Sequence, residues 1–201
     1  MGHNAPVSSQ PRLRILDSDE ARAAAETAGV DASVTVLNLN RVLFHHPGMG
    51  RRFVQYFTEL MFKHRVDPRL RELAILRIAW VTGSVYEWTQ HWHVAVGLGL
   101  SPDDLLGVRD PDSHPGYDDL DRAVLAAVDD VVVAGSVSPP TWERLAAHLD
   151  EAQLVEVVMF VCGWRMVASI LLSLEVPLED GTEPWPPDGV VPDTAAGEPV
   201  R

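Results

Sequence analysis

Hydrophobic residues recur along most of this chain at intervals of three and four positions, which is the spacing of one face of an α-helix. In "YDDLDRAVLAAVDDVVVAG" the apolar positions fall on a single stripe, made of Leu120, Val124, Ala127, Val128 and Val131. Alternating apolar and polar residues with a β-branched bias, the mark of a half-buried strand, are scarce. The pattern therefore predicts an all-α protein.

Helix boundaries are marked by residues that cap helices. Asp67 and Pro68 predict a helix start, Gly83 predicts the end of that helix, and Ser84 opens the next one. We expect a bundle of about seven helices whose core is built from three long ones. The predicted helices include 18–28, 34–44, 68–82, 84–97, 102–107 and 152–175.

The two ends of the chain lack this periodicity. Residues 1–16 are predicted to be extended, and residues 179–201, rich in Pro, Gly and acidic residues, form a tail that runs over a surface or stays disordered. The 201 residues suit one domain with a sizeable core, so residues 17–178 are expected to form a single helical domain.

Charge and cysteine content narrow the class of protein. The net charge of −13 argues against binding to nucleic acid or to anionic membranes, because both need a basic face. The single cysteine, Cys162, excludes an internal disulfide, and the first residues lack the apolar run of a signal peptide. We therefore expect a cytoplasmic protein. Residues 154–174 have membrane-spanning length, but Glu156 and Arg165 within them favour a buried core helix.

Candidate chemistry is concentrated in the stretch "GSVYEWTQHWH". Ser84, Glu87 and His91 are spaced three and four residues apart, so they lie on one stripe of the predicted helix. Two interpretations stay open. Ser84 and Glu87 fit a capping box that satisfies the first backbone amides, while Glu87 and His91 fit a hydrogen-bonded pair at a site.

The preceding predicted helix, 68–82, is apolar nearly all round and should be buried, yet it carries Glu72. A buried carboxylate needs a partner or a raised pKa, and both are common at functional sites. The alternative is an internal ion pair, of Glu72 with Arg77 or with Arg165, that only fixes packing.

The segment "RELAILRIAWVTGSVYEWTQHWHVAVGLGLS" resembles the core motif of the carboxymuconolactone decarboxylase and alkylhydroperoxidase D-like superfamily. The similarity extends through "FHHPGMGRRFVQYFTELMF" and "LDEAQLVEVVMFVCGWRMVASILLSLEVPLE", and covers about residues 35–179. It implies an alkylhydroperoxidase D-like helical bundle.

Carried over by position, the resemblance matches Glu72 and His91 to the glutamate and histidine of the family's proton relay. The two cysteine positions of the redox branch fall on Ser84 and Glu87, which form neither a thiolate nor a disulfide. This implies a non-redox member that is not a thiol peroxidase. Cys162 lies on another predicted helix and is expected to be a core residue.

The resemblance to non-redox members, which include a decarboxylase of a lactone acid, implies a lyase or isomerase. It would act without a cofactor on a small oxygenated carbonyl or lactone, by general acid–base catalysis. The expected catalytic residues are Glu72, Glu87 and His91. The expected substrate-binding residues are Tyr86, Arg165, Ser84 and Trp88.

Arg165 departs from the family pattern, because a Tyr-His-Met run there reads Trp164, Arg165 and Met166. Its guanidinium either holds a substrate carboxylate or enolate oxygen, or neutralises a buried glutamate. Two other classes of function stay open. One is a metal-dependent enzyme with Glu87 and His91 as ligands, and the other is a non-catalytic oligomeric binding protein. A homo-oligomer is expected in each case.

Overall fold

The computed structural model describes residues 11–184, 186 and 188–190; most of the predicted N-terminal segment and of the predicted tail lies outside these residues. The described part of the chain holds nine α-helices and one 3-10 helix, and no strand. The all-α fold class is confirmed, although several short helices raise the count above seven. In chain order the elements are α1 (Ser18–Thr27), η1 (Ala32–Val36), α2 (Asn38–Leu43), α3 (Pro47–Phe62), α4 (Pro68–Thr82), α5 (Val85–Gly97), α6 (Pro102–Gly107), α7 (Asp119–Ala134), α8 (Pro139–Ala146) and α9 (Glu151–Leu174).

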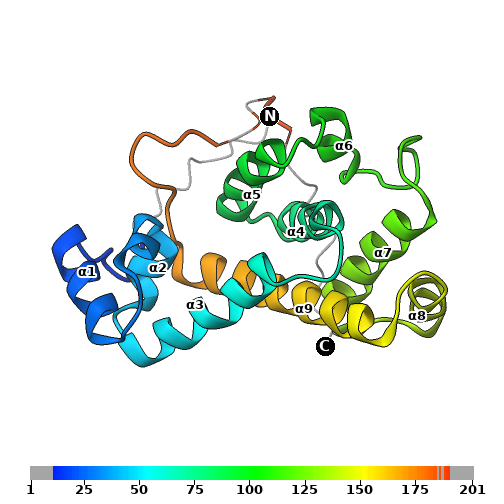
Figure 1. Cartoon of the computed structure of the whole chain (residues 1–201). Coiled ribbons are helices and arrows are strands. Elements are labelled where there is room, and N and C mark those ends of the chain that lie inside the picture. Colours follow the sequence, from blue (N-terminus) through cyan, green and yellow to red (C-terminus); the bar gives the residue numbers. More distant parts are fainter. Residues whose placement is uncertain (1–10, 185, 187, 191–201) are drawn as a thin grey trace.

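Helix α4 lies at the centre of the fold, where it contacts α5, α7 and α9 (Figure 1). Helices α1 and α2 lie toward one end of the long helix α9, and α7 and α8 lie toward its other end. Because α4 is surrounded, its buried residues point in every direction, as its all-round apolar sequence predicts. They are Leu70, Arg71, Glu72, Leu73, Ala74, Ile75, Leu76, Ile78 and Ala79.

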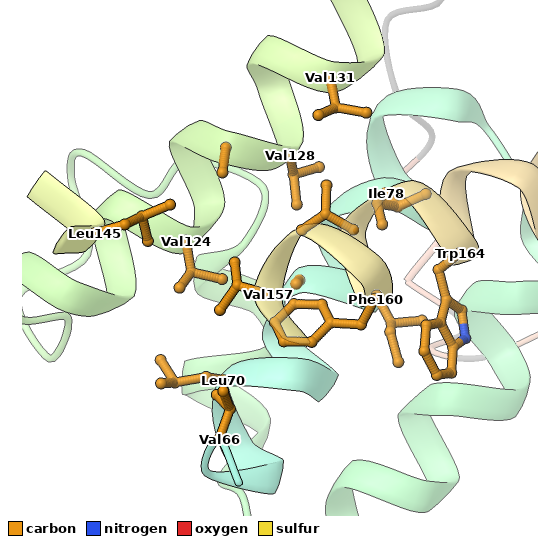
Figure 2. Close-up of a cluster of buried hydrophobic side chains, with 14 of the residues drawn as sticks. Val66, Leu70, Ile78, Val124, Val128, Val131, Leu145, Val157, Phe160 and Trp164 are labelled. Carbon is orange, nitrogen blue, oxygen red and sulfur yellow. The ribbon is translucent and has the colours of Figure 1, made fainter. Parts of the chain in front are cut away.

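The largest apolar cluster joins α4, α7 and α9 (Figure 2). Val157 and Phe160 of α9 lie between Ile78 of α4 and Val124 and Val128 of α7, and all five side chains are at most 1% exposed. Burial of each such side chain contributes about 1.5–3 kcal/mol to folding. This cluster fixes α4 and α9 as a rigid support for the polar residues that they carry.

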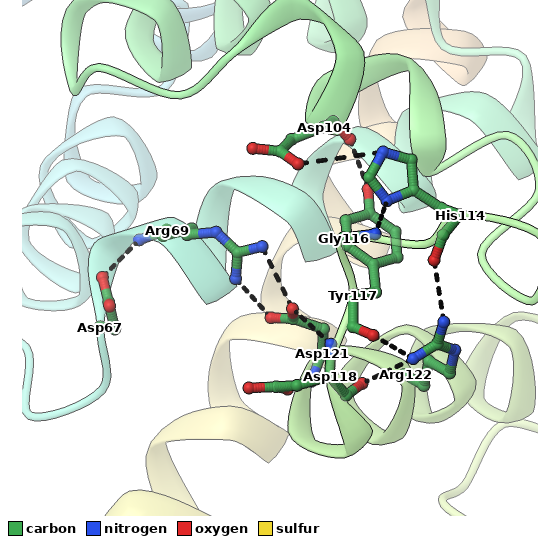
Figure 3. Close-up of polar contacts among 9 residues, drawn as sticks. All are labelled: Asp67, Arg69, Asp104, His114, Gly116, Tyr117, Asp118, Asp121 and Arg122. Carbon is green, nitrogen blue, oxygen red and sulfur yellow. Dashed lines mark hydrogen bonds and ion pairs between the residues drawn. The ribbon is translucent and has the colours of Figure 1, made fainter.

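Polar contacts hold the start of α4 to the start of α7 (Figure 3). Arg69 binds both carboxylate oxygens of Asp121, with 3.1 Å between Nη2 and Oδ2. Asp121 is 3% exposed and also closes the capping box of α7 with Asp118. A buried carboxylate that is paired in two ways fixes the register of the two helices more firmly than a surface ion pair would.

The junction between α4 and α5 follows the sequence prediction. Asp67 caps α4 by accepting the Arg69 amide, and Gly83 ends it with φ +71°, a left-handed conformation that glycine adopts at little cost. The tight turn at Gly83 sends α5 back along α4. As a result, one face of α5 lies against Glu72.

The prediction of one helix over 34–44 was wrong, because the segment is divided. Residue Leu37 has ψ 130°, an extended conformation, and it separates η1 from α2. The β-branched run at 34–36 disfavours a continuous α-helix and forms part of the 3-10 helix η1, which local periodicity alone did not reveal.

Among the described residues, α9 is the one helix long and apolar enough to cross a membrane by length and composition. Core helices of soluble proteins pass the same test, and its inward face here forms part of the core in Figure 2. Its outward face leaves apolar side chains exposed, namely Val155, Met159, Met166 and Leu172.

Candidate functional site

A cavity of about 370 Å³ lies among η1, α2, α3, α5 and α9, a size within the range of small-molecule sites. Most of its lining is aliphatic or aromatic. From α5 come Tyr86, Glu87, Gln90 and His91, and from α9 comes Trp164. The structure therefore places one face of helix α5 against an apolar cavity.

Behind this wall His91 is joined to a buried ion pair. Its Nδ1 lies 2.7 Å from Oε2 of Glu72, which is fully buried, and Oε1 of Glu72 accepts a hydrogen bond of 3.1 Å from Nε of Arg71. Burial alone would raise the pKa of Glu72, but the His91 ring and the Arg71 guanidinium together hold it below its ordinary value. Glu72 is therefore a carboxylate that orients His91.

The other nitrogen of His91 is also engaged. Nε1 of Trp164 lies 3.1 Å from Nε2 of His91. An indole N–H only donates, so Nε2 accepts and carries no proton, and Nδ1 is the nitrogen that donates to Glu72. This network assigns the tautomer, with the proton on Nδ1 and Nε2 as the acceptor, and both His91 and Trp164 line the cavity.

Glu87 is the least satisfied polar group at the site. It is 1% exposed, and neither carboxyl oxygen has a hydrogen-bond partner. Burial raises the pKa of Glu87 well above its ordinary value, while the charge of Arg165 and the neighbouring Ser84 hydroxyl oppose this shift. Burial therefore favours the neutral carboxylic acid form of Glu87, which has a proton to donate.

The capping-box interpretation of Ser84 and Glu87 is not realised. Ser84 is the N-cap residue of α5, but its side chain accepts no capping hydrogen bond, and its backbone amide bonds to the carbonyl of Ala79. Its hydroxyl makes no hydrogen bond of standard geometry, and neither does the Glu87 carboxyl, although the hydroxyl lies near enough to oppose the rise in the pKa of Glu87. Since the cap does not explain it, the burial of Glu87 calls for another explanation.

Tyr86 lines the cavity but directs its hydroxyl elsewhere. It donates to Oε1 of Glu179 over 2.5 Å, and Nε2 of Gln90 donates to Oε2 of the same carboxylate over 2.5 Å. Burial and the Glu179 carboxylate raise the pKa of Tyr86, so it keeps its proton. The tail was predicted to begin at residue 179, yet this residue is bonded to the helical domain.

Three predicted substrate-binding residues, Ser84, Arg165 and Trp88, lie outside the lining of the cavity. Arg165 is half-buried and donates to the Ser169 hydroxyl. Trp88 packs between Trp80 and Trp92, with ring centroids 5.7 and 5.9 Å away, in a separate apolar cluster. Because Trp88 follows Glu87 directly, it lies on another face of α5.

The two ion-pair alternatives for Glu72 are also not realised. Arg77 pairs with Asp129 over 2.8 Å, and the partner of Glu72 is Arg71 instead. Sequence reasoning missed Arg71, Trp164 and Glu179. The one available signal was that α4 is apolar on all sides, which leaves no exposed face for Arg71.

Glu87 and His91, the two candidate metal ligands from the sequence, lack a third ligand among the described residues. Among the described residues no group of three His, Cys, Asp or Glu side chains is arranged to hold a metal ion. Cys162 was expected in the core, but it is exposed on α9, because its position falls on the outward stripe of that helix.

Residues 47–130 match the sequence profile of the carboxymuconolactone decarboxylase family. This segment contains Glu72, Ser84, Glu87 and His91, and the resemblance inferred from the motifs is thus confirmed. The absence of a Cys-x-x-Cys pair agrees with the single cysteine in the chain. No curated protein matches the chain significantly.

Several solved structures share the fold. An uncharacterised peroxidase-related protein from Silicibacter sp. TM1040 aligns with a TM-score of 0.70 and 11% identity, over 89% of this chain and 97% of its own. An alkylhydroperoxidase D core protein from Ralstonia eutropha JMP134 aligns with a TM-score of 0.69 and 17% identity, over 87% of this chain and 95% of its own.

A variant of the debrominase Bmp8, in complex with 2,3,4-tribromopyrrole, aligns with a TM-score of 0.67 and 14% identity, over 86% of this chain and 94% of its own. At these identities the likeness establishes the fold and leaves the reaction open.

Proposed function

We propose, from the match of residues 47–130 to the carboxymuconolactone decarboxylase family, that this chain is a lyase or isomerase working without a cofactor. The proposed reaction is general acid–base catalysis on a small oxygenated carbonyl or lactone in the cavity that Glu87 and His91 line.

The observation that carries the proposal is the state of Glu87. A fully buried carboxyl without any hydrogen-bond partner is costly for folding, by about 1–3 kcal/mol or more. Proteins retain such groups where a perturbed pKa serves chemistry. A neutral acid at the wall of an apolar cavity can donate a proton, or a strong hydrogen bond, to a carbonyl oxygen that becomes negative during the reaction.

His91 supplies the complementary base in this proposal. Its unprotonated Nε2 accepts a proton from a carbon next to the carbonyl once the substrate displaces the Trp164 indole from that nitrogen. The Glu72 carboxylate then stabilises the imidazolium through Nδ1, and Arg71 keeps Glu72 ionised. Return of the proton to another carbon completes an isomerisation, and its return to a leaving oxygen completes a lyase reaction.

The residues at the redox positions support a non-redox reaction. Ser84 and Glu87 provide no thiol, and Cys162 lies on the outward face of α9. We expect no thiol-dependent reduction of peroxides above background. Among the proteins of similar fold, the debrominase binds a small heterocycle, which supports a small-molecule substrate here.

Exchange of carbon-bound hydrogen with D2O tests the proposal without a known product. A panel of small lactones and ketones is incubated with the protein in D2O, and exchange next to the carbonyl is followed by NMR. We expect catalysed exchange that falls by about two to four orders of magnitude in Glu87→Gln and in His91→Asn. Glu143→Gln, an exposed position on α8, is the matched control.

Two results would count against the proposal. One is near-normal exchange by well-folded Glu87→Gln. The other is no exchange of any panel member by the native chain, which favours a binding protein on the same scaffold.

A further inference from the structure

The cavity wall carries no cationic side chain among the described residues. Its polar members are Asn40, Thr58, Tyr86, Glu87, Gln90 and His91, and the remaining lining is aliphatic or aromatic. Two guanidiniums lie near the site, but neither belongs to the cavity lining. Arg71 is bound to Glu72 and to the carbonyls of Leu60 and Met61, while Arg165 donates one N–H to the Ser169 hydroxyl and its charge acts on Glu87.

Most of the donors that a bound carboxylate would need are also occupied, including the Asn40 amide, which donates to the carbonyl of Val34. The Tyr86 hydroxyl and the Gln90 amide both donate to Glu179, and the Nδ1 proton of His91 is donated to Glu72. Trp164 donates its indole proton to His91. Glu87 offers one proton, enough for one neutral oxygen acceptor.

The electrostatic surroundings disfavour an anion further. Glu72 lies as a carboxylate directly behind His91, and the chain carries a net charge of −13. Burial of a carboxylate without a cation costs several kcal/mol, more than a few apolar contacts recover.

The entrance to the cavity is apolar. Among the lining residues, Val36 is 65% exposed, Phe62 is 76% exposed and Val94 is 37% exposed. Exposed apolar side chains around a cavity favour the entry of ligands that shed water easily.

We propose that this site takes an uncharged small molecule with a largely apolar skeleton and one carbonyl oxygen for Glu87, such as a neutral lactone, ester or ketone, and not a carboxylic acid. The inference rests on the proposed function, since Glu87 is the donor there. It also narrows the reaction, because loss of carbon dioxide requires a substrate carboxylate. The reaction left for this site is proton transfer at a carbon atom next to a neutral carbonyl group.

A pair of probes with one skeleton and different charge tests this inference. Methyl benzoate and benzoate are titrated into the native chain at neutral pH, and the indole N–H resonance of Trp164 reports binding. We expect saturable shifts with methyl benzoate, and binding of benzoate weaker by about tenfold or more.

A designed change of charge at Thr58, an exposed lining residue of α3, gives the converse test. Thr58→Arg adds a cation to the wall, and Thr58→Gln is a neutral control of similar length. We expect Thr58→Arg to gain affinity for benzoate relative to methyl benzoate, and Thr58→Gln to keep the preference of the native chain for methyl benzoate.

Equal or tighter binding of benzoate by the native chain overturns the inference, as does a lack of any shift with methyl benzoate at millimolar concentration. The proposed function is judged separately by hydrogen exchange. If the native chain prefers benzoate and hydrogen exchange is lost in Glu87→Gln, only this inference is wrong. If the native chain prefers methyl benzoate and hydrogen exchange persists in Glu87→Gln, the site binds neutral molecules but the acid–base role of Glu87 is wrong.

Discussion

In the proposed function, a single carboxyl group, that of Glu87, donates the proton. It is buried beside an apolar cavity, it lacks hydrogen-bond partners, and burial raises its pKa well above the ordinary value. Glu72, whose Oε2 lies 2.7 Å from Nδ1 of His91, has the opposite character, because the His91 ring and the Arg71 guanidinium hold its pKa below the ordinary value. Two carboxyl groups with pKa values pushed apart are the arrangement that acid–base catalysis needs.

The pH dependence of stability reports the state of Glu87. Above the ordinary pKa the unfolded chain loses this proton while the folded chain keeps it, so the unfolded state binds fewer protons and stability falls as pH rises. The slope from this group is at most about 1.4 kcal/mol per pH unit, until pH passes the folded pKa. Urea unfolding from pH 5 to 8 should therefore show Glu87→Gln gaining stability relative to the native chain as pH increases.

The control for that series is Glu143→Gln, which should keep a constant offset from the native chain at every pH. A Glu87→Gln curve parallel to the native curve would show that Glu87 is ionised in the folded protein.

Glu72 should behave differently, as a structural carboxylate. Glu72→Gln leaves the buried Arg71 without its counter-charge, and breaking a buried pair in this way costs about 3–5 kcal/mol. We expect a loss of about 3 kcal/mol in the free energy of unfolding at neutral pH, or failure to fold. A well-folded variant that loses less than about 1 kcal/mol would contradict the role assigned to the pair.

At this scale the sequence predicted part of the site. Helical spacing placed Glu87 and His91 on one face, and the resemblance added Glu72. Arg71 and Trp164 were missed because their roles depend on which neighbouring helix each side chain meets. Trp88 was misplaced for a related reason: the next residue along a helix points to a different neighbour.

At the scale of elements, the segment that follows α9 is bonded to residues that line the cavity. Its Glu179 accepts three hydrogen bonds, from Tyr86, from Gln90 and from the backbone amide of Asn38 at 2.8 Å. The segment thereby ties α2 to α5 across one side of the cavity. The predicted boundary at 179 followed composition, which does not reveal that one acidic residue is bonded to the domain.

Removal of this carboxylate should loosen α2 without harming the core. In Glu179→Gln we expect the Asn38 amide to exchange with D2O about tenfold faster, because a neutral acceptor makes weaker hydrogen bonds. Asp180→Asn, at the next and exposed position, should leave the rate unchanged. Equal protection of Asn38 in both variants would show that the contact does not hold the segment.

At the scale of the whole molecule, the outward stripe of α9 suggests assembly. Val155, Met159, Cys162 and Met166 are exposed and follow one another at intervals of four, three and four residues. That is the spacing of a seam between paired helices. The apolar periodicity predicted α9 at 152–175, close to its observed bounds Glu151–Leu174.

We predict that this stripe joins copies of the chain into a homo-oligomer. Light scattering at micromolar concentration should give a mass above that of one 22.1 kDa chain. Met159→Glu, which places a charge in the stripe, should shift the mass to the monomer, and Glu143→Gln should leave it unchanged. A monomeric native chain would refute assembly by this face.

The most direct test of the central claim is the infrared spectrum of the Glu87 carboxyl group. At neutral pH the native chain should show a carbonyl stretch of a protonated carboxylic acid in the difference against Glu87→Gln, because burial keeps the proton on Glu87. The band should shift on binding of a neutral carbonyl compound that accepts its hydrogen bond. A difference spectrum with only carboxylate bands at neutral pH would contradict the account.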